Sequence, residues 1–178
     1  FIDSSGNEKV RIDLGLQEKT SETPSEKLQN KADRPYFSKA KKDKPSIYIS
    51  SFDLNIENNV VQLPYKPMLR IVSPVFGANG IWEGVIVLNV KGNKILEQLT
   101  KADAASIANI YLTNSKGQWL KGDSPESEWL FMFEEDVSTS MGRDFPSAWQ
   151  NIAGYNLGQF QTEAGLFTFT TIDASSLA

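Results

Sequence analysis

The chain of 178 residues contains neither cysteine nor histidine. Without cysteine there are no disulfide bridges and no thiol nucleophiles, and without either residue type there is no zinc site built on thiolates or imidazoles. Every catalytic dyad or triad that uses imidazole as its base is excluded as well. The remaining routes to catalysis are paired carboxylates, a Ser–Lys dyad or a metal ion held by oxygen ligands.

Long hydrophobic runs and a strong basic charge are also missing. No apolar stretch approaches the roughly 20 residues that a membrane span needs, and the run 85–88 has only the length of a strand. The net charge is −4: residues 1–97 hold 14 basic against 12 acidic residues, and residues 98–178 hold 4 against 10. Neither half is basic enough to bind nucleic acid, because that affinity comes largely from neutralising phosphates. The basic cluster at 39–44 is interpreted as a solvated helix end.

The residues that are present form the patterns of a folded protein. Hydrophobic residues make up 40% and charged residues 22% of the chain, which is typical of globular domains. Met68–Val75 and Ile81–Val90 are the strongest strand candidates, and Asn79-Gly80 between them is a strong hairpin signal. Apolar residues at helical spacing predict a helix over 94–101. Weaker signals predict the other elements of the first half: a hairpin of 1–2 with 10–12, a short helix from 23–26 capped by Ser25, helical turns from Pro35, a strand over 46–50 and a turn or loop over 53–59.

The second half repeats this order of elements in a shorter form. The elements predicted there are strands over 110–113 and 118–121, a loop or helix over 128–133, a short helix over 145–149, and a closing hairpin of 158–162 with 166–172. Each half thus offers a hairpin, a helical interlude and a second hairpin. This order predicts an α+β fold of two related modules, each an antiparallel sheet with helices on one face, joined by the segment 91–105.

Acidic residues are the candidates for catalytic or metal-binding chemistry. They form a run at 134–136 and a looser group at Asp123, Glu126 and Glu128. Adjacent residues of a helix or strand do not face one site, and no spacing matches a calcium-binding loop. Exposed acidic loops are therefore the favoured interpretation, and we expect no catalytic residue, no metal and no cofactor. A metal hydrolase with oxygen ligands stays as a minor alternative.

Two arginines lie among apolar or aromatic residues. Arg34 precedes an aromatic pair, and Arg70 lies inside a predicted strand. A planar guanidinium with five donors suits bidentate capture of a carboxylate. From the alternation along the strand alone, Arg70 is expected to point to solvent, because exposed arginine is the norm. Tyr36, Phe37 and Tyr48 fit a hydrophobic core as well as a ligand site.

A family resemblance covers nearly the whole chain. The segments that carry it in the first half are 33–40 (DRPYFSKA), 48–55 (YISSFDLN) and 84–89 (GVIVLN), with Pro64, Pro67, Arg70, Pro74 and Val75 between them. Those of the second half are 111–120, 128–133, 145–149 and 165–169. In this order they resemble the extracytoplasmic double Cache (PAS-like) sensor domains of bacterial histidine kinases, diguanylate cyclases and chemoreceptors. Each motif is short, and their joint occurrence makes the resemblance specific.

The resemblance implies a particular organisation. A membrane-distal, ligand-binding PAS-like module would span 1–98, and a membrane-proximal PAS-like module would span 99–178. The long N-terminal stalk helix of the family is missing from this segment, as are the flanking spans that tether such sensors to the membrane. The segment would be the periplasmic or extracellular portion of a bacterial inner-membrane protein, and the full-length protein would be a homodimer.

The resemblance also implies a ligand site in the first module. In amino-acid-binding members an arginine, two aromatics and an alanine grip the ligand carboxylate, and Arg34, Tyr36, Phe37 and Ala40 match that pattern here. Asn89 stands where the family has an aspartate that pairs with the ligand ammonium, which favours a carboxylate without an amine or another small polar metabolite. The candidate ligand-binding residues are Arg34, Tyr36, Phe37, Tyr48, Asp53, Arg70, Ser73 and Asn89.

The expected function is ligand recognition rather than chemistry. The segment would be the sensor of a membrane-bound signal-transduction receptor, most simply a sensor histidine kinase, that binds a small molecule and passes a conformational change across the membrane. A kinase or diguanylate cyclase output domain would lie elsewhere in the full-length protein. A secreted or surface binding module without signalling output is the main alternative. In the second module, Trp119, Trp129 and Trp149 are interpreted as core residues.

Overall fold

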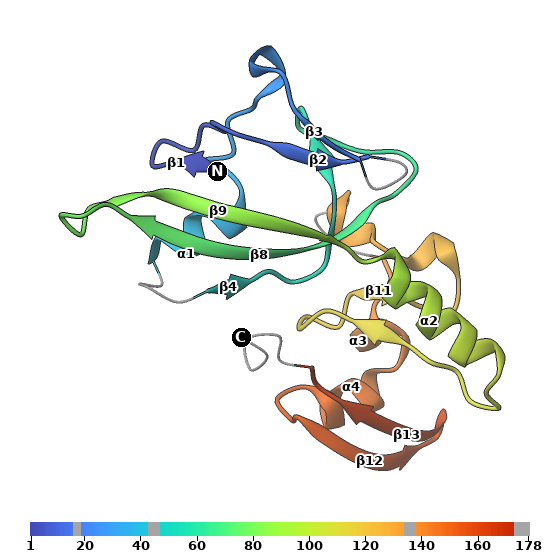
Figure 1. Ribbon diagram of the computed structural model, residues 1–178. Coiled ribbons are helices and arrows are strands. Elements are labelled where there is room, and N and C mark those ends of the chain that lie inside the picture. The colour runs from blue at the N-terminus through green and yellow to red at the C-terminus, as the bar shows by residue number, and fades with distance from the viewer. Residues whose placement is uncertain (16–18, 43–46, 134–137, 173–178) are drawn as a thin grey trace.

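The computed structural model (Figure 1) describes residues 1–15, 19–42, 47–133 and 138–172. Its first half contains a five-stranded antiparallel sheet with the order β1-β9-β8-β4, and β5 also pairs with β8. These strands are β1 (Ile2–Asp3), β4 (Tyr48–Ile49), β5 (Asp53–Leu54), β8 (Pro67–Phe76) and β9 (Trp82–Lys91). Three of the segments interpreted above, 43–44, Ser46 and the acidic run 134–136, lie outside the described residues.

The two longest strands, β8 and β9, form the predicted hairpin. They pair in register from Met68 with Lys91 to Val75 with Gly84. In the turn, Gly80 has a φ of 73°, which glycine adopts without strain, and Asn79 Oδ1 accepts a 3.0 Å hydrogen bond from the N–H of Ile81, just before β9. The prediction of both strands and of their turn is confirmed to within one residue at each end.

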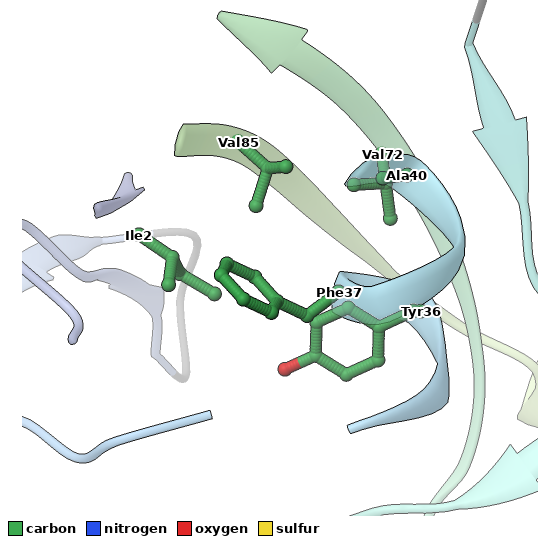
Figure 2. Close-up of a cluster of buried hydrophobic side chains, with 6 residues drawn as sticks. All are labelled: Ile2, Tyr36, Phe37, Ala40, Val72 and Val85. Carbon is green, nitrogen blue, oxygen red and sulfur yellow. The ribbon is translucent and has the colours of Figure 1, made fainter. Parts of the chain in front are cut away.

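Helix α1 (Pro35–Lys42) covers one face of this sheet. Pro35 occupies its first position, as predicted, where the missing N–H removes no helical hydrogen bond. The backbone oxygen of Arg34 accepts the first helical bonds, from Phe37 and Ser38. The hydrophobic cluster between α1 and the sheet consists of Ile2, Tyr36, Phe37, Ala40, Val72 and Val85 (Figure 2).

The segment before α1 differs from the prediction. Phe1 and Val10 do lie side by side, since the terminal amino group donates a 2.8 Å hydrogen bond to the Val10 oxygen. However, β1 pairs with β9, while β2 (Ile12–Leu14) pairs with β3 (Thr20–Glu22). The predicted hairpin is therefore present next to its turn, where Ile2 forms an antiparallel bridge with Glu8 and Phe1 bonds to Lys9 and Val10, but its expected continuation at 11–12 is wrong, because Ile12 pairs with Glu22. The short 3-10 helix Ser25–Lys27 is present, but no side chain caps it, so the capping role predicted for Ser25 is wrong as well.

Gly84 explains why β1 joins the sheet. It has a φ of 150°, and a Cβ on it would lie 2.0 Å from the backbone oxygen of Ile2. Only glycine allows both this conformation and this close approach of two strands. The local hairpin pattern gave no indication of this second contact, because it joins residues 82 positions apart in the chain.

Residues 53–59, predicted to form a turn or loop, contain short strands and part of a turn. Besides β5, β6 (Ile56–Glu57) pairs with β7 (Val60–Val61). Asn58 and Asn59 connect them with φ values of 50° and 61°. A two-residue hairpin turn requires such left-handed residues, and asparagine tolerates them well. The predicted turn is therefore present at Asn58-Asn59, whereas the short strands on either side of it were not predicted.

The second half contains two separate hairpins. Helix α2 (Asn93–Ala104) leads into it from β9, as predicted (Figure 1). Strand β10 (Leu112–Thr113) pairs with β11 (Trp119–Lys121), and β12 (Leu157–Thr162) pairs with β13 (Gly165–Thr170), but the two pairs do not join into one sheet in the described residues. The helices between them are η3 (Pro125–Ser127), η4 (Leu130–Met132), α3 (Met141–Asp144), which was not predicted, and α4 (Pro146–Ile152). A tandem pair of similar modules stays a prediction.

Two hydrophobic clusters organise this half. One contains the buried Trp119 with aromatic rings of the β12–β13 hairpin, and Trp149 packs against it. The other joins Leu54 of β5 to Leu120 and Trp129 of the second half, and Leu96 of α2 packs against it. The interpretation of the three tryptophans as core residues is confirmed. Within the described ranges, every helix is too short or too polar to span a bilayer.

Candidate functional site

Arg70 is buried beneath α1. It lies on the same face of β8 as Met68 and Val72, because alternate residues of a strand share a face, and only 5% of it is exposed. The expectation from alternation alone that Arg70 points to solvent is therefore wrong. Its backbone is also fixed, since its N–H donates to Ser50 Oγ (2.9 Å) and its oxygen accepts from the Ser50 N–H (2.8 Å).

Three side chains surround the guanidinium of Arg70. Its Nη1 donates to the carboxylate of Asp53, and its Nη2 lies 3.5 Å from Asn55 Oδ1. The ring of Tyr36 lies beneath it, with 5.1 Å between the guanidinium carbon and the ring centroid, which is a cation–π arrangement. A buried charge requires such partners, because removing an unpaired ion from water is very costly.

Burial dominates the protonation of this cluster. It raises the pKa of Tyr36 to about 12, although Arg70 and Arg34 act in the opposite direction. Tyr36 is thus a neutral hydroxyl at physiological pH. Burial also raises the pKa of Asp53 from its ordinary value, while Arg70 and Arg34 oppose that shift without cancelling it.

Arg34 completes the cluster from the start of α1. Its side chain is half-buried and acts electrostatically on both Tyr36 and Asp53. No described residue forms a hydrogen bond or an ion pair with the Arg34 guanidinium. The two arginines therefore differ: Arg70 has a carboxylate partner, whereas Arg34 has none within the described part of the chain.

A polar network extends from this cluster toward the N-terminal segment. Asn55 Nδ2 donates to Glu57 Oε1 (3.3 Å). Glu57 Oε2 in turn accepts from Gln29 (2.6 Å) and Arg11 (3.2 Å), and lies 3.5 Å from Lys31 Nζ. Burial alone would raise the pKa of Glu57, but Lys31, Arg11 and the hydrogen bonds together hold it below its ordinary value.

Three residues of this network, Lys31, Asn55 and Glu57, are not among the site residues predicted from the sequence. Lys31 is only 6% exposed, which is rare for lysine unless it is paired, and nothing in its sequence context marks it. A signal did exist for the other two. Asp53, Asn55 and Glu57 alternate with apolar residues, and this period of two is typical of one polar face of an extended chain.

The other predicted site residues are distributed around this cluster. Asn89 is the direct cross-strand partner of Arg70 on the same face of the sheet and is exposed. Tyr48 pairs with Val72 and lies beneath the amino group of Lys39, 5.4 Å from its ring centroid. Phe37 packs in the hydrophobic cluster with its ring centroid 5.5 Å from that of Trp82.

Ser73 is not part of the cluster. It is three positions from Arg70 on a regular stretch of β8, so the two side chains point to opposite faces of the sheet. We therefore leave Ser73 out of the site. Arg34, Tyr36, Asp53, Arg70 and Asn89, together with the newly found Ser50 and Asn55, define what we call the arginine cluster.

An open groove of about 530 Å³ lies next to the network, on the N-terminal side. It is lined by residues of β2, β3, the helix Ser25–Lys27 and the β6–β7 turn, and its wall includes Arg11 and Glu57. None of Arg34, Tyr36 or Arg70 lines it. The arginine cluster and the groove are thus neighbouring features that share the Glu57 network.

The fold is a mixed α/β domain with an antiparallel sheet, and the family model places it in the class of bacterial sensor domains. The chain belongs to the family of bacterial histidine kinase sensor domains, since the family model "Bacterial histidine kinase, sensor domain" matches residues 1–177. The expected resemblance to bacterial sensor domains is confirmed. A search of the curated proteins found no match.

Solved structures agree with this fold. The chain is similar to the extracellular domain of the histidine kinase vpHK1S-Z8, with a TM-score of 0.77 and 24% identity over 98% of this chain and 62% of that one. It is similar to a domain of a sensory box/GGDEF family protein from Vibrio parahaemolyticus, with a TM-score of 0.77 and 24% identity over 97% and 64% of the two chains. The ligand-binding domain of Mlp24 with asparagine matches at a TM-score of 0.54 and 10% identity, over 89% and 60%. The chain therefore spans less than two thirds of the length of these structures.

Proposed function

We propose that this sensor domain binds a small molecule with an anionic group at the arginine cluster. The observation that carries the proposal is Arg34, a half-buried cation without a partner among the described residues, next to the ion pair of the buried Arg70 with Asp53. Two guanidinium groups against one carboxylate leave one positive charge. A carboxylate ligand would supply the missing counter-charge and accept bidentate hydrogen bonds.

The neutral groups of the cluster support a ligand without an amine. Tyr36 and Asn89 offer a hydroxyl and an amide rather than a second free carboxylate. Mlp24, the neighbour solved with asparagine, has a ligand that carries both a carboxylate and an amine; the carboxylate is the part that the two arginines here would recognise. We propose a small carboxylate or another small polar metabolite for this chain, with Tyr36 and Tyr48 as walls of the site.

Membership of the sensor-domain family supports a proposal for the wider role. We place the ligand site in a distal module, 1–98, and the coupling to the rest of the receptor in a proximal module, 99–178. The first module would exist in two arrangements, and the ligand would favour the one that it binds more tightly. The free energy by which it shifts this equilibrium cannot exceed the difference between its binding free energies for the two arrangements. In the full-length protein, a homodimer tethered to the inner membrane by flanking spans, this change would pass from the periplasm to an output domain such as a histidine kinase.

A thermal-shift screen with a library of carboxylates and amino acids tests the proposal. A binder at 100 times its dissociation constant adds about 2.7 kcal/mol to the free energy of unfolding, so the melting temperature should rise clearly. Arg34→Ala should weaken binding roughly ten- to a hundred-fold, since a hydrogen-bonded charge contributes about 1.5–3 kcal/mol.

The matched control is Arg143→Ala, which removes an exposed arginine of the second half. It should bind the same compound with unchanged affinity. A compound that binds Arg34→Ala as tightly as the unchanged protein would contradict the site. A library without any binder at millimolar concentration would contradict the function.

A further inference from the structure

Strand β5 is only two residues long, and its two side chains face opposite environments. Asp53 pairs with Met68 and Leu54 with Pro67 in the register of the sheet. Because neighbouring residues of a strand point to opposite faces, Asp53 reaches the guanidinium of Arg70 while Leu54 points away from it. Asp53 of the arginine cluster is therefore bonded directly to Leu54, whose side chain packs on the opposite face of the strand.

Leu54 contacts the second half of the chain. Its side chain is completely buried and packs in a cluster with Leu120 and Trp129. Phe52, on the other side of Asp53, packs against the same cluster and against the backbone of Gly92, where a Cβ would lie 2.2 Å from its ring. Gly92 immediately precedes α2. Both neighbours of Asp53 are thus packed against elements that lead into the second half.

Asp53 is the exposed member of its ion pair. Its side chain is 34% exposed, whereas that of Arg70 is 7% exposed. Arg70 is held by the backbone of β8 and by Ser50, so the carboxylate is the partner that can leave. Asp53 also presents to Arg70 the same chemical group as a carboxylate ligand would.

We propose that the ligand's carboxylate competes with Asp53 for Arg70, and that the resulting movement of β5 passes through Leu54 to Trp129. This inference rests on the ligand site proposed above and adds its regulation. Asp53 is an internal competitor that sets the affinity of the site. The cluster of Leu54, Leu120 and Trp129 is the contact by which the second half responds to occupation of the first.

The transmission can be tested without any ligand. Asp53→Asn keeps the shape of the side chain but removes its charge, and so weakens its hold on Arg70. We expect the indole N–H signal of Trp129 in a nitrogen-15 NMR spectrum, assigned with Trp129→Phe, to shift, while that of Trp149 in the other cluster stays in place. In a Leu54→Val background the shift caused by Asp53→Asn should shrink, because the side chain that carries the movement is smaller.

The matched control is Asp13→Asn. Asp13 pairs with Arg11 in the same half, but it does not belong to β5. It should leave the Trp129 signal unchanged. A Trp129 signal that does not move in Asp53→Asn, or that moves equally in Asp13→Asn, would overturn the transmission through β5.

The competition is tested with sodium acetate as the carboxylate probe and sodium chloride as the ionic-strength control. Asp53→Asn should bind acetate roughly tenfold more tightly, since a direct charge–charge competitor is removed. Equal affinity in both proteins would overturn the competition. If acetate bound to neither protein, the ligand site would fail for this probe and so would the competition, whereas the Trp129 shift would still decide the transmission.

Discussion

Replacing Leu54 by alanine is expected to lower the free energy of unfolding by about 2–5 kcal/mol. Leu54 has 0% exposure and packs between Leu120, Trp129 and several partly buried side chains from both halves. The loss combines the transfer of the removed carbon atoms with the cavity they leave. Urea denaturation followed by tryptophan fluorescence measures it, and a thermal scan should show a decrease of roughly 2–4 °C for each kcal/mol.

The control for this substitution is Leu166→Ala on β13. Leu166 is 68% exposed, so its loss should change the free energy of unfolding by no more than about 0.5 kcal/mol. Because Leu54 belongs to a cluster shared by both halves, the unchanged protein should unfold in one cooperative transition. A cost below about 1 kcal/mol for Leu54→Ala, or two separate transitions, would mean that the halves are packed independently.

The elements with strong local signals were predictable from the sequence. The β8–β9 hairpin follows from two apolar runs around Asn79-Gly80, and α1 and α2 follow from Pro35 and from helical spacing. The pairing of β1 with β9 was not predictable, because it depends on the steric fit between Gly84 and Ile2 across the sheet. Local patterns indicate strands, but long-range partners are set by contacts that the pattern does not contain.

The candidate site was predictable in its residue types and less so in its geometry. Arg34 and Tyr36 were selected on a family pattern and Arg70 on its place among apolar residues, and the structure brings the three together between the start of α1 and the sheet. The burial of Arg70 could not be predicted from the alternation of residues along the strand. A polar residue in that pattern normally marks the exposed face, and the sequence does not show when such a residue is instead buried with a partner. Lys31 was missed for the same reason, since its burial depends on Glu57, which lies 26 residues further along the chain.

The two arginines of the cluster have different physical roles. Arg70 is neutralised by Asp53 and fixed by Ser50, so it holds β5, β8 and the β4 side of the sheet together. Arg34 lies at the start of a helix without such partners in the described residues. A ligand carboxylate could therefore pair with Arg34 at once, whereas Arg70 must first be released from Asp53. This release is the step by which ligand binding would change the position of β5.

Replacing Glu57 by glutamine is expected to cost roughly 2–3 kcal/mol of unfolding free energy. Removing one partner of a buried ion pair costs about 3–5 kcal/mol, and Glu57 keeps 17% side-chain exposure, which reduces the loss. The buried Lys31 would lose its counter-charge, while the amide could still accept a hydrogen bond from Gln29. Urea denaturation at pH 7 measures the difference. Glu97→Gln on the exposed surface of α2 is the control and should change stability by no more than about 0.5 kcal/mol.

The pH dependence of this difference tests the electrostatic explanation. The pKa of Glu57 is lowered from its ordinary value of 4.5 in the folded protein, so its contribution is present above that pH and disappears as the pH falls through the folded-state pKa. The stability difference between the unchanged protein and Glu57→Gln should therefore narrow below about pH 4.5. The pKa of Asp53 is raised in the folded protein, so its contribution to stability is lost as the pH rises rather than as it falls. Asp53 is present in both proteins, and its contribution therefore cancels when their unfolding free energies are subtracted. A difference that stays constant from neutral to acidic pH would mean that Glu57 acts by packing and not by its charge.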